Sequence, residues 1–388
     1  MSDMKKPILL LILLSLSYAS LLWEYSTDGS VSAKPTIFQG MVVAASDDGN
    51  IYAIDPASGG KKWQAKAGLD PNEVFVFDNG VVASTTSGKV VKIGSTGNIL
   101  WELNLNTTKY NTSYIYGTSA NLNYIFVTAD NGVYVIEKNG SVRAKIANFN
   151  NTLLTAPVAG PDYVVYGKDK ELIKTAENGQ ILWRAKLSEG SFWLSRPVIE
   201  GGVIYIGALD SKLHSYVAAN GLEMWEARAR NWVTGTPLVS EGVAYFGSND
   251  GGLYAVDSGS GEVKWIARTA LAVQSQPEEG SMGGEETIFV GSTDKSIYAM
   301  SEDTGEIIWK GSAGGSVGSP LFYQNEVIFG SADGKISAYS TERACSITTP
   351  TEAEVVGLKE VVVSGKYASE AGNAMVMVQV NNGNWQEA

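Results

Sequence analysis

The stretch SNDGGLYAVDSGSGEVKW at residues 248–265 combines an Asp-Gly turn, an alternating apolar segment, a second glycine and a tryptophan. Taken alone, it is compatible with a cofactor loop, a calcium loop or a structural repeat. Similar stretches recur along the chain, among them SDDGNIYAIDPASGGKKW at 46–63 and TDKSIYAMSEDTGEIIW at 293–309. Because the same pattern is used again and again, we interpret it as a structural repeat.

The repeat ends at an anchor residue that is usually tryptophan and recurs about every 40 residues, a period typical of β-propeller blades. Within each unit, apolar segments alternate with turn residues; TPLVSEGVAYFGS at 236–248, for example, divides into two strands at Glu241-Gly242. The anchors are Trp23, Trp63, Trp101, Arg143, Trp183, Trp225, Trp265 and Trp309. A glycine suited to a turn with positive φ precedes each internal anchor. These glycines are Gly59, Gly97, Gly140, Gly179, Gly221, Gly261 and Gly305.

The two ends of the repeat region complete each other. After Trp309 come three strand-like segments without a final tryptophan segment, whereas LLWEYS at 21–26 is a tryptophan segment with no unit before it. Together they predict an eighth blade, whose closure removes exposed sheet edges. The first strand of six blades begins with proline, as expected of innermost strands along a central channel. These prolines are Pro35, Pro157, Pro197, Pro237, Pro277 and Pro320.

Composition narrows the chemistry that is available. Charged residues make up 18% of the chain and the formal net charge is -12, so nucleic acid is a poor partner. The only cysteine, Cys345, cannot form an internal disulfide. Cys345 and His214 are too few soft ligands for a Cys/His zinc site, and no calcium loop occurs. We therefore expect no catalytic residues, no cofactor-binding residues and no metal site.

The chain is expected to have three parts. Residues 1–19 combine lysines, an apolar run and small residues before a cleavage position, which predicts a signal peptide; an uncleaved membrane anchor is the alternative. Residues 20–343 form the propeller. Residues 344–388 read as a linker followed by the opening strands of an immunoglobulin-like module, too short for a full sandwich.

The repeat pattern V-Y-x-G-S-x-D-G-x-L-Y-A-x-D-x-x-[ST]-G-x-x-x-W resembles the tryptophan-docking repeat of the PQQ-like, quinoprotein-type eight-bladed propellers. The resemblance covers residues 20 to 343 and implies an all-β fold. The family includes quinoprotein alcohol dehydrogenases and a non-enzymatic outer-membrane barrel-assembly lipoprotein. Its enzymes are implied to use an adjacent-cysteine disulfide and calcium ligands with pyrroloquinoline quinone (PQQ), but no adjacent cysteines are present here.

Residues that depart from the repeat are the candidates for function. His214 occupies the column held by Tyr52, Tyr134, Tyr254 and Tyr298, so a packed histidine is favoured over a general base. Aspartates recur at the turn between the second and third strands, where capping of the turn is favoured over an acidic ring. The candidate partner-binding patch comprises Trp193, Arg196, Arg228, Arg230 and Trp232. Possible N-glycosylation sites are Asn106, Asn111, Asn139 and Asn150.

The sequence therefore favours an exported, monomeric and non-catalytic propeller scaffold. Its partner would be a protein or glycan of the periplasm, cell surface or extracellular space, and the membrane would be contacted only through an uncleaved N-terminal segment. The alternative is a PQQ-dependent dehydrogenase, with the cofactor and calcium at the mouth of the central channel.

Overall fold

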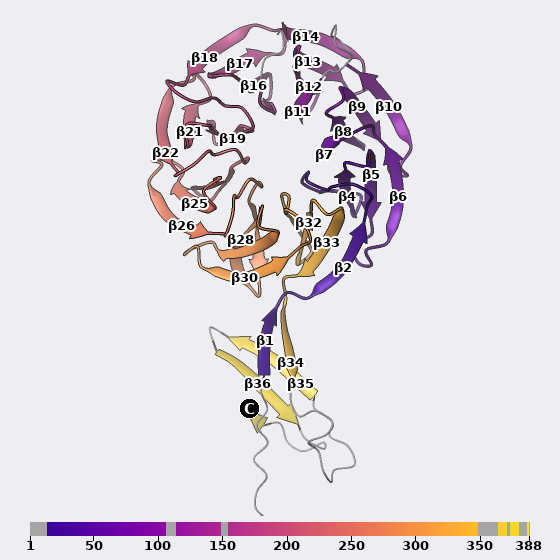
Figure 1. The fold of residues 1–388 in the computed structure, drawn as a ribbon, viewed down its shortest axis with the longest axis vertical. Helices are drawn as coiled ribbons and strands as arrows, with labels where there is room; N and C mark the ends of the chain where they lie inside the picture. The colour runs from indigo at the N-terminus through magenta and orange to yellow at the C-terminus, as the bar shows by residue number, and fades with distance from the viewer. Residues whose placement is uncertain are drawn as a thin grey trace, which may run out of the picture. The chain divides into compact units, whose positions relative to one another are not determined.

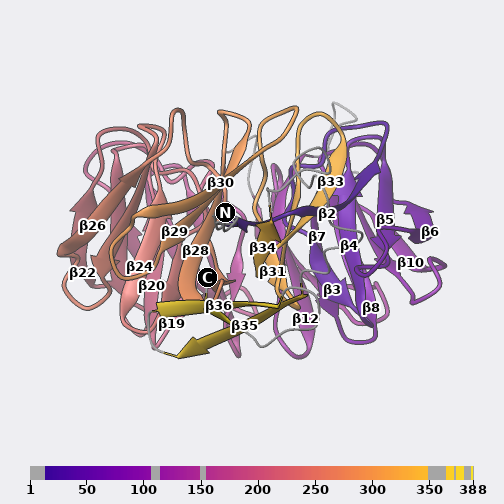
Figure 2. The ribbon, with the colours of Figure 1, turned by 90° about the horizontal axis from the view of Figure 1, so that it is seen from below.

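Antiparallel strands account for the regular structure of the chain in the computed structural model, which describes residues 14–105, 114–148, 154–347, 364–370, 373–379 and 386–387. No helix occurs in these ranges. Ala19–Glu342 is one compact unit, and the residues before and after it belong to a second unit. In the first unit, eight four-stranded sheets stand around a common centre (Figure 1), with loops at both faces of the ring (Figure 2). This confirms the eight-bladed all-β propeller.

Each blade is a meander in which the chain runs from the innermost to the outermost strand. Blade one contains β3 (Thr36–Phe38), β4 (Met41–Ser46), β5 (Asn50–Ile54) and β6 (Lys61–Lys66). Blade two contains β7 (Pro71–Phe77), β8 (Gly80–Thr85), β9 (Lys89–Ile93) and β10 (Ile99–Asn104). Blade three contains β11 (Ile115–Ala120), β12 (Tyr124–Ala129), β13 (Gly132–Glu137) and β14 (Val142–Asn148). Blade four contains β15 (Val158–Ala159), β16 (Tyr163–Lys168), β17 (Glu171–Ala176) and β18 (Ile181–Lys186).

The second half of the ring repeats this order. Blade five contains β19 (Val198–Glu200), β20 (Val203–Gly207), β21 (Lys212–Val217) and β22 (Glu223–Arg228). Blade six contains β23 (Leu238–Ser240), β24 (Val243–Gly247), β25 (Gly252–Asp257) and β26 (Val263–Arg268). Blade seven contains β27 (Glu278–Met282), β28 (Glu285–Ser292), β29 (Ser296–Ser301) and β30 (Ile307–Ser312).

Blade eight is built from both ends of the propeller, as predicted. Its inner strands are β31 (Leu321–Tyr323), β32 (Glu326–Gly330) and β33 (Lys335–Ser340), and its outermost strand is β2 (Leu21–Ser26). Strands β2 and β33 pair antiparallel, with Trp23 opposite Ala338. The ring is therefore closed by backbone hydrogen bonds between residues that lie more than 300 positions apart in the sequence.

The repeat tryptophans hold neighbouring blades together. Trp183 of blade four is 91% buried, and its indole lies so close to Gly221 of blade five that a Cβ there would sit 2.6 Å from the ring. The indole Nε1 of Trp183 donates to the carbonyl of Ala218 at 3.0 Å. Gly221 has a φ of +73°, so it allows both the turn and the close approach of the ring. Trp23, Trp63, Trp101, Trp225 and Trp265 lie against glycines of the next blade in the same way.

Blade three has no docking tryptophan, and the structure corrects the anchor that the sequence indicated there. In blade four, Trp183 pairs with Lys174 of the third strand, next to a shift in register. The residue at that position in blade three is Ala144, which pairs with Val135, and not Arg143. Arg143 instead lies over the ring of Tyr124 at 4.9 Å from its centroid. The backbone of Ile146 takes the place of an indole against Gly179. The spacing of the turn glycine agrees with this correction, because Gly140 lies four residues before Ala144, as Gly179 lies four residues before Trp183.

The second unit contains two small sheets. Strand β1 (Leu14–Tyr18) pairs with β34 (Arg343–Ile347), and β35 (Ser364–Glu370), β36 (Asn373–Gln379) and β37 (Gln386–Glu387) form a three-stranded sheet. The described part of 344–388 is thus β-structured, while the immunoglobulin-like topology stays a prediction. The signal peptide at 1–19 also stays a prediction, since residues 1–13 lie outside the described residues.

Candidate functional site

The innermost strands and the connections that lead to them surround a polar cavity of about 520 Å³ at the centre of the ring. Residues from six blades line it, including Lys34, Asn72, Glu73, Arg196 and Gln276. Short innermost strands that begin after proline leave room for these side chains. The central channel is therefore lined by polar and charged groups of both signs.

The charged groups of the channel are paired across blades. Arg196 of blade five donates from Nη2 to the carboxylate Oε1 of Glu73 in blade two and to the Thr118 carbonyl in blade three at 3.3 Å. The other Glu73 oxygen accepts hydrogen bonds from Thr118 N and Oγ1 at 2.6 and 2.7 Å. Lys34 pairs with Glu278 at 2.6 Å between Nζ and Oε2. Glu73 is thus held in place by three donors.

Beside the channel lies a second cavity of about 530 Å³, which we call the aromatic recess. Its walls include Tyr114, Tyr116, Trp193 and Leu194, and Arg196 borders both this recess and the channel. The two tyrosine rings meet edge to face, with their centroids 5.0 Å apart. Burial, together with nearby acidic groups, raises the pKa of Tyr116 to about 12, so its phenol stays protonated and can donate a hydrogen bond.

Leu194 is the most unusual residue of the aromatic recess. Its backbone adopts a φ of +71°, a conformation that is costly for a leucine, and its side chain is 54% exposed. An exposed leucine in such a conformation contributes little to the core of the propeller. Strained residues of this kind cluster at functional sites, so Leu194 marks the recess as a candidate binding site.

The structure divides the patch that the sequence indicated. Trp193 and Arg196 lie together in the aromatic recess, whereas Trp232 is 47% exposed on the connection between β22 and β23. Arg228 ends β22 and is exposed, and Arg230 is engaged through its backbone N–H, which donates to Asp250 at 3.0 Å. The role of these five residues in binding stays a prediction. Sequence reasoning missed Tyr114, Tyr116 and Leu194. None of the three belongs to a repeated column, and nothing in the sequence marks them as neighbours of Trp193.

His214 packs as the repeat predicts. His214 is 98% buried on β21, and its Nε2 lies 3.0 Å from Oδ2 of Asp210. Tyr254 and Tyr298 make the equivalent contact from their hydroxyls to Asp250 and Asp294. Burial acts to lower the pKa of His214, but its hydrogen bonds to Asp210 and Glu223 outweigh burial and raise the pKa. The histidine therefore takes over the tyrosine's hydrogen bond to the turn.

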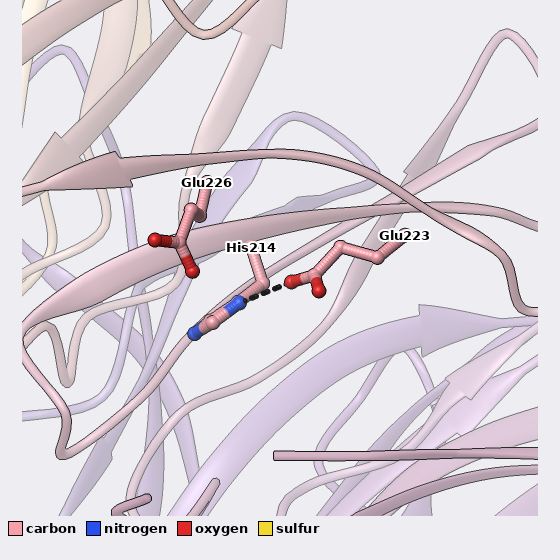
Figure 3. A group of neighbouring side chains, drawn as sticks. All are labelled: His214, Glu223 and Glu226. Carbon is pink, nitrogen blue, oxygen red and sulfur yellow. Dashed lines mark hydrogen bonds and ion pairs between the residues drawn. The ribbon is translucent and has the colours of Figure 1, made fainter. Parts of the chain in front are cut away.

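His214 also belongs to a group of possible metal ligands on the outer part of blade five (Figure 3). Its Nδ1 lies 2.7 Å from Oε1 of Glu223, and Glu226 stands opposite it on β22. One ligand atom from each of these three residues lies within 4.8 Å of the others. Among the described residues, this is the group whose donor atoms suit a transition-metal ion.

The recurring aspartates cap their own turns. Asp48, Asp210 and Asp250 accept hydrogen bonds from the backbone N–H two residues further along the chain. Asp48 and Asp250 also accept one from the connection that enters the blade, at Asp28 and Arg230. These contacts support turn capping over a cation-binding ring.

The predicted glycosylation sites are only partly within the described residues. Asn139 is exposed in the turn after β13, and its side-chain oxygen accepts hydrogen bonds from the backbone and hydroxyl of Ser141. Asn106, Asn111 and Asn150 lie outside the described residues. Modification at any of the four stays a prediction.

A comparison with protein families matches the chain to the family described as outer membrane protein assembly factor BamB, over residues 10–175, 168–280 and 271–384. The chain belongs to the BamB family. The match spans the propeller and confirms the resemblance to PQQ-like propellers. A comparison with curated proteins gives no match. No helix formed by the described residues has the length and apolar character needed to cross a membrane.

Two solved structures share the fold of this BamB-family chain. The crystal structure of BamB from Moraxella catarrhalis aligns with a TM-score of 0.66 and 18% identity, covering 83% of this chain and 99% of that one. The computationally designed Ika8 protein aligns with a TM-score of 0.69 and 19% identity, covering 81% and 98%. At these identities the two structures establish a common propeller fold.

Proposed function

We propose that this protein is a non-catalytic binding scaffold of the cell envelope that recognises a protein partner through the aromatic recess. The observation that carries the proposal is the recess itself, where Trp193, Tyr114, Tyr116 and an exposed Leu194 surround a cavity beside the channel. Tryptophan, tyrosine and arginine supply most of the energy at protein interfaces, and here they stand together at a face built from connections.

The chemistry of the channel supports binding over catalysis. Glu73 is occupied by Arg196 and Thr118, and Lys34 is occupied by Glu278, so these groups fix the shape of the channel mouth. Arg196 connects this fixed network to the wall of the recess. A recess whose walls are held in place loses little conformational entropy when a partner binds. We expect this function to require no cofactor.

The family description supports both the class of partner and the location. BamB is described as an outer membrane protein assembly factor, which suits a scaffold that contacts another protein outside the cytoplasm. We further propose that residues 1–19 direct export and that residues 344–388 begin an immunoglobulin-like surface module. N-terminal sequencing of the protein recovered from the cell envelope tests the first of these statements.

The proposal is tested by affinity capture from the envelope of the producing cell. Replacing Trp193 by Ala removes the largest wall of the recess and is expected to abolish capture. Trp232→Ala is the comparison, because Trp232 belongs to the predicted patch but lies outside the residues that line the recess; if the recess alone binds the partner, this variant keeps full capture. Full capture by a folded Trp193→Ala protein would contradict the proposal, and capture of glycan instead of protein would reassign its ligand class.

A further inference from the structure

Blade five departs from the other blades at two positions that face each other. His214 stands in the tyrosine column, and Glu223 lies two residues before the anchor Trp225. The residues at the position of Glu223 in the other blades are Leu21, Lys61, Ile99, Val142, Ile181, Val263 and Ile307. The chain's single histidine and the single carboxylate of that column thus coincide in one blade.

The imidazole ring has a polar atom that the tyrosines lack. Nε2 contacts Asp210, as the tyrosine hydroxyls contact their own aspartates, and this fixes the orientation of the ring. The second nitrogen, Nδ1, points to Glu223 at 2.7 Å (Figure 3). A neutral imidazole carries one N–H, so with Nε2–H donating to Asp210 the lone pair of Nδ1 faces a carboxylate. Two acceptors at this distance need a positive charge between them, which is either the second proton of an imidazolium or a metal ion that takes the place of that proton at Nδ1.

A carboxylate behind a histidine is the arrangement found at many metal sites. Asp210, whose side chain is only 8% exposed, would accept the N–H of His214 and hold the tautomer in which Nδ1 is free to coordinate. Glu226, opposite His214 on β22, supplies a further carboxylate. The Glu223 and Glu226 side chains are 45% and 48% exposed, so an ion can reach the group from solvent.

We propose that His214, Glu223 and Glu226 bind a divalent transition-metal ion such as Zn²⁺. One nitrogen and two carboxylate ligands suit Zn²⁺, which then keeps a coordination position for water. The ligands come from the paired strands β21 and β22, so the ion cross-links the outer part of blade five. This site is independent of the aromatic recess and goes beyond the proposed scaffold function.

Lys212 competes with the metal ion for Glu226. Its Nζ lies 2.5 Å from Oε1 of Glu226, and the same ion pair recurs in blade eight, where Lys335 contacts Glu24 at 2.7 Å. Binding of the ion must release Lys212 from Glu226. Removal of the Lys212 charge is therefore expected to strengthen metal binding, while removal of the Lys335 charge leaves it unchanged.

The experiment is a titration of the chelator-treated full chain with Zn²⁺ by calorimetry and with Co²⁺ by absorption spectroscopy. The wild type is expected to bind one ion per chain. His214→Tyr restores the residue of the repeat and its contact to Asp210, and it is expected to abolish binding without unfolding the blade. Asp210→Asn is expected to weaken affinity by about 10- to 100-fold, the usual effect of losing a carboxylate behind a histidine ligand.

Lys212→Met and Lys335→Met form the matched pair. Tighter binding by Lys212→Met alone supports the site. The proposal is overturned if the wild type binds no ion, if His214→Tyr binds as tightly as the wild type, or if the two lysine variants behave alike. Should His214→Tyr fail to fold by circular dichroism, Glu223→Gln replaces it, because Gln keeps the size of the side chain and removes a ligand; unchanged affinity then overturns the proposal.

Discussion

Replacement of Trp23 by Ala tests how the ring is closed. Trp23 lies on β2, the strand that completes blade eight, and is 93% buried. Its indole packs against Gly59 of blade one and donates from Nε1 to the Pro56 carbonyl at 2.5 Å. A buried aromatic ring removes about 150–250 Å² from water, worth about 4–6 kcal/mol at 25 cal/mol per Å². The hydrogen bond adds about 1 kcal/mol, and the retained Cβ offsets part of the loss.

We therefore expect Trp23→Ala to lower the free energy of unfolding by about 4 kcal/mol, within the range usual for such core truncations. The assay is urea unfolding followed by circular dichroism. Leu22→Ala is the control on the same strand, because Leu22 is 46% exposed and its loss is expected to cost less than about 0.5 kcal/mol. Equal unfolding midpoints for the two variants would refute the closure by β2.

Three further predictions concern other parts of the propeller. Gly221→Ala places a Cβ 2.6 Å from the Trp183 ring and should lower the free energy of unfolding by more than about 1 kcal/mol in the same denaturant assay. Gly201→Ala is the control, because Gly201 also has a positive φ but lies in open space, so this variant reports backbone strain alone. Arg196→Met leaves Glu73 with only its Thr118 donors and should cost about 1–3 kcal/mol in thermal unfolding; an unchanged transition would mean that the pair does not form. The pKa of His214 is raised above 6.5 in the folded protein, so its stabilising contribution is full below pH 6.5 and is lost as the pH rises through the raised pKa. In metal-free buffer, the free energy of unfolding of His214→Tyr should not show this loss. Parallel pH profiles of stability for the variant and the wild type would contradict the prediction.

The repeat is the reason why so much of the fold could be predicted. A tryptophan and a preceding glycine that return every 40 residues report the same contact many times, as at Trp183 and Gly221. The unmatched segment at 21–26 revealed the closure of the ring because it lacked a unit of its own. In blade three the anchor was predicted one residue too early, because no tryptophan marks it, although Gly140 stands four residues before Ala144 as in the other internal blades.

The candidate site was predicted less well than the fold, for a physical reason. Cavities form from connections, and connections lack the periodicity that identifies strands. Trp193 and Arg196 were found because they depart from the repeat, but their distance from Trp232 could not be judged from sequence separation. Leu194 was missed because its significance lies in its backbone conformation, which no side-chain pattern reports. Glu223 was missed because the strand register places it opposite Tyr216, and its contact with His214 is made by the side chain alone.

The most direct test of the scaffold function is site-specific photo-crosslinking in the envelope of the producing cell. A photoreactive phenylalanine at Leu194 faces the aromatic recess, and the same residue at Leu122, which is 89% exposed on the turn between β11 and β12, serves as the control. We predict a discrete crosslinked protein partner from position 194 and none from position 122. Crosslinks of equal yield from both positions, or none from position 194, would contradict a binding role for the recess.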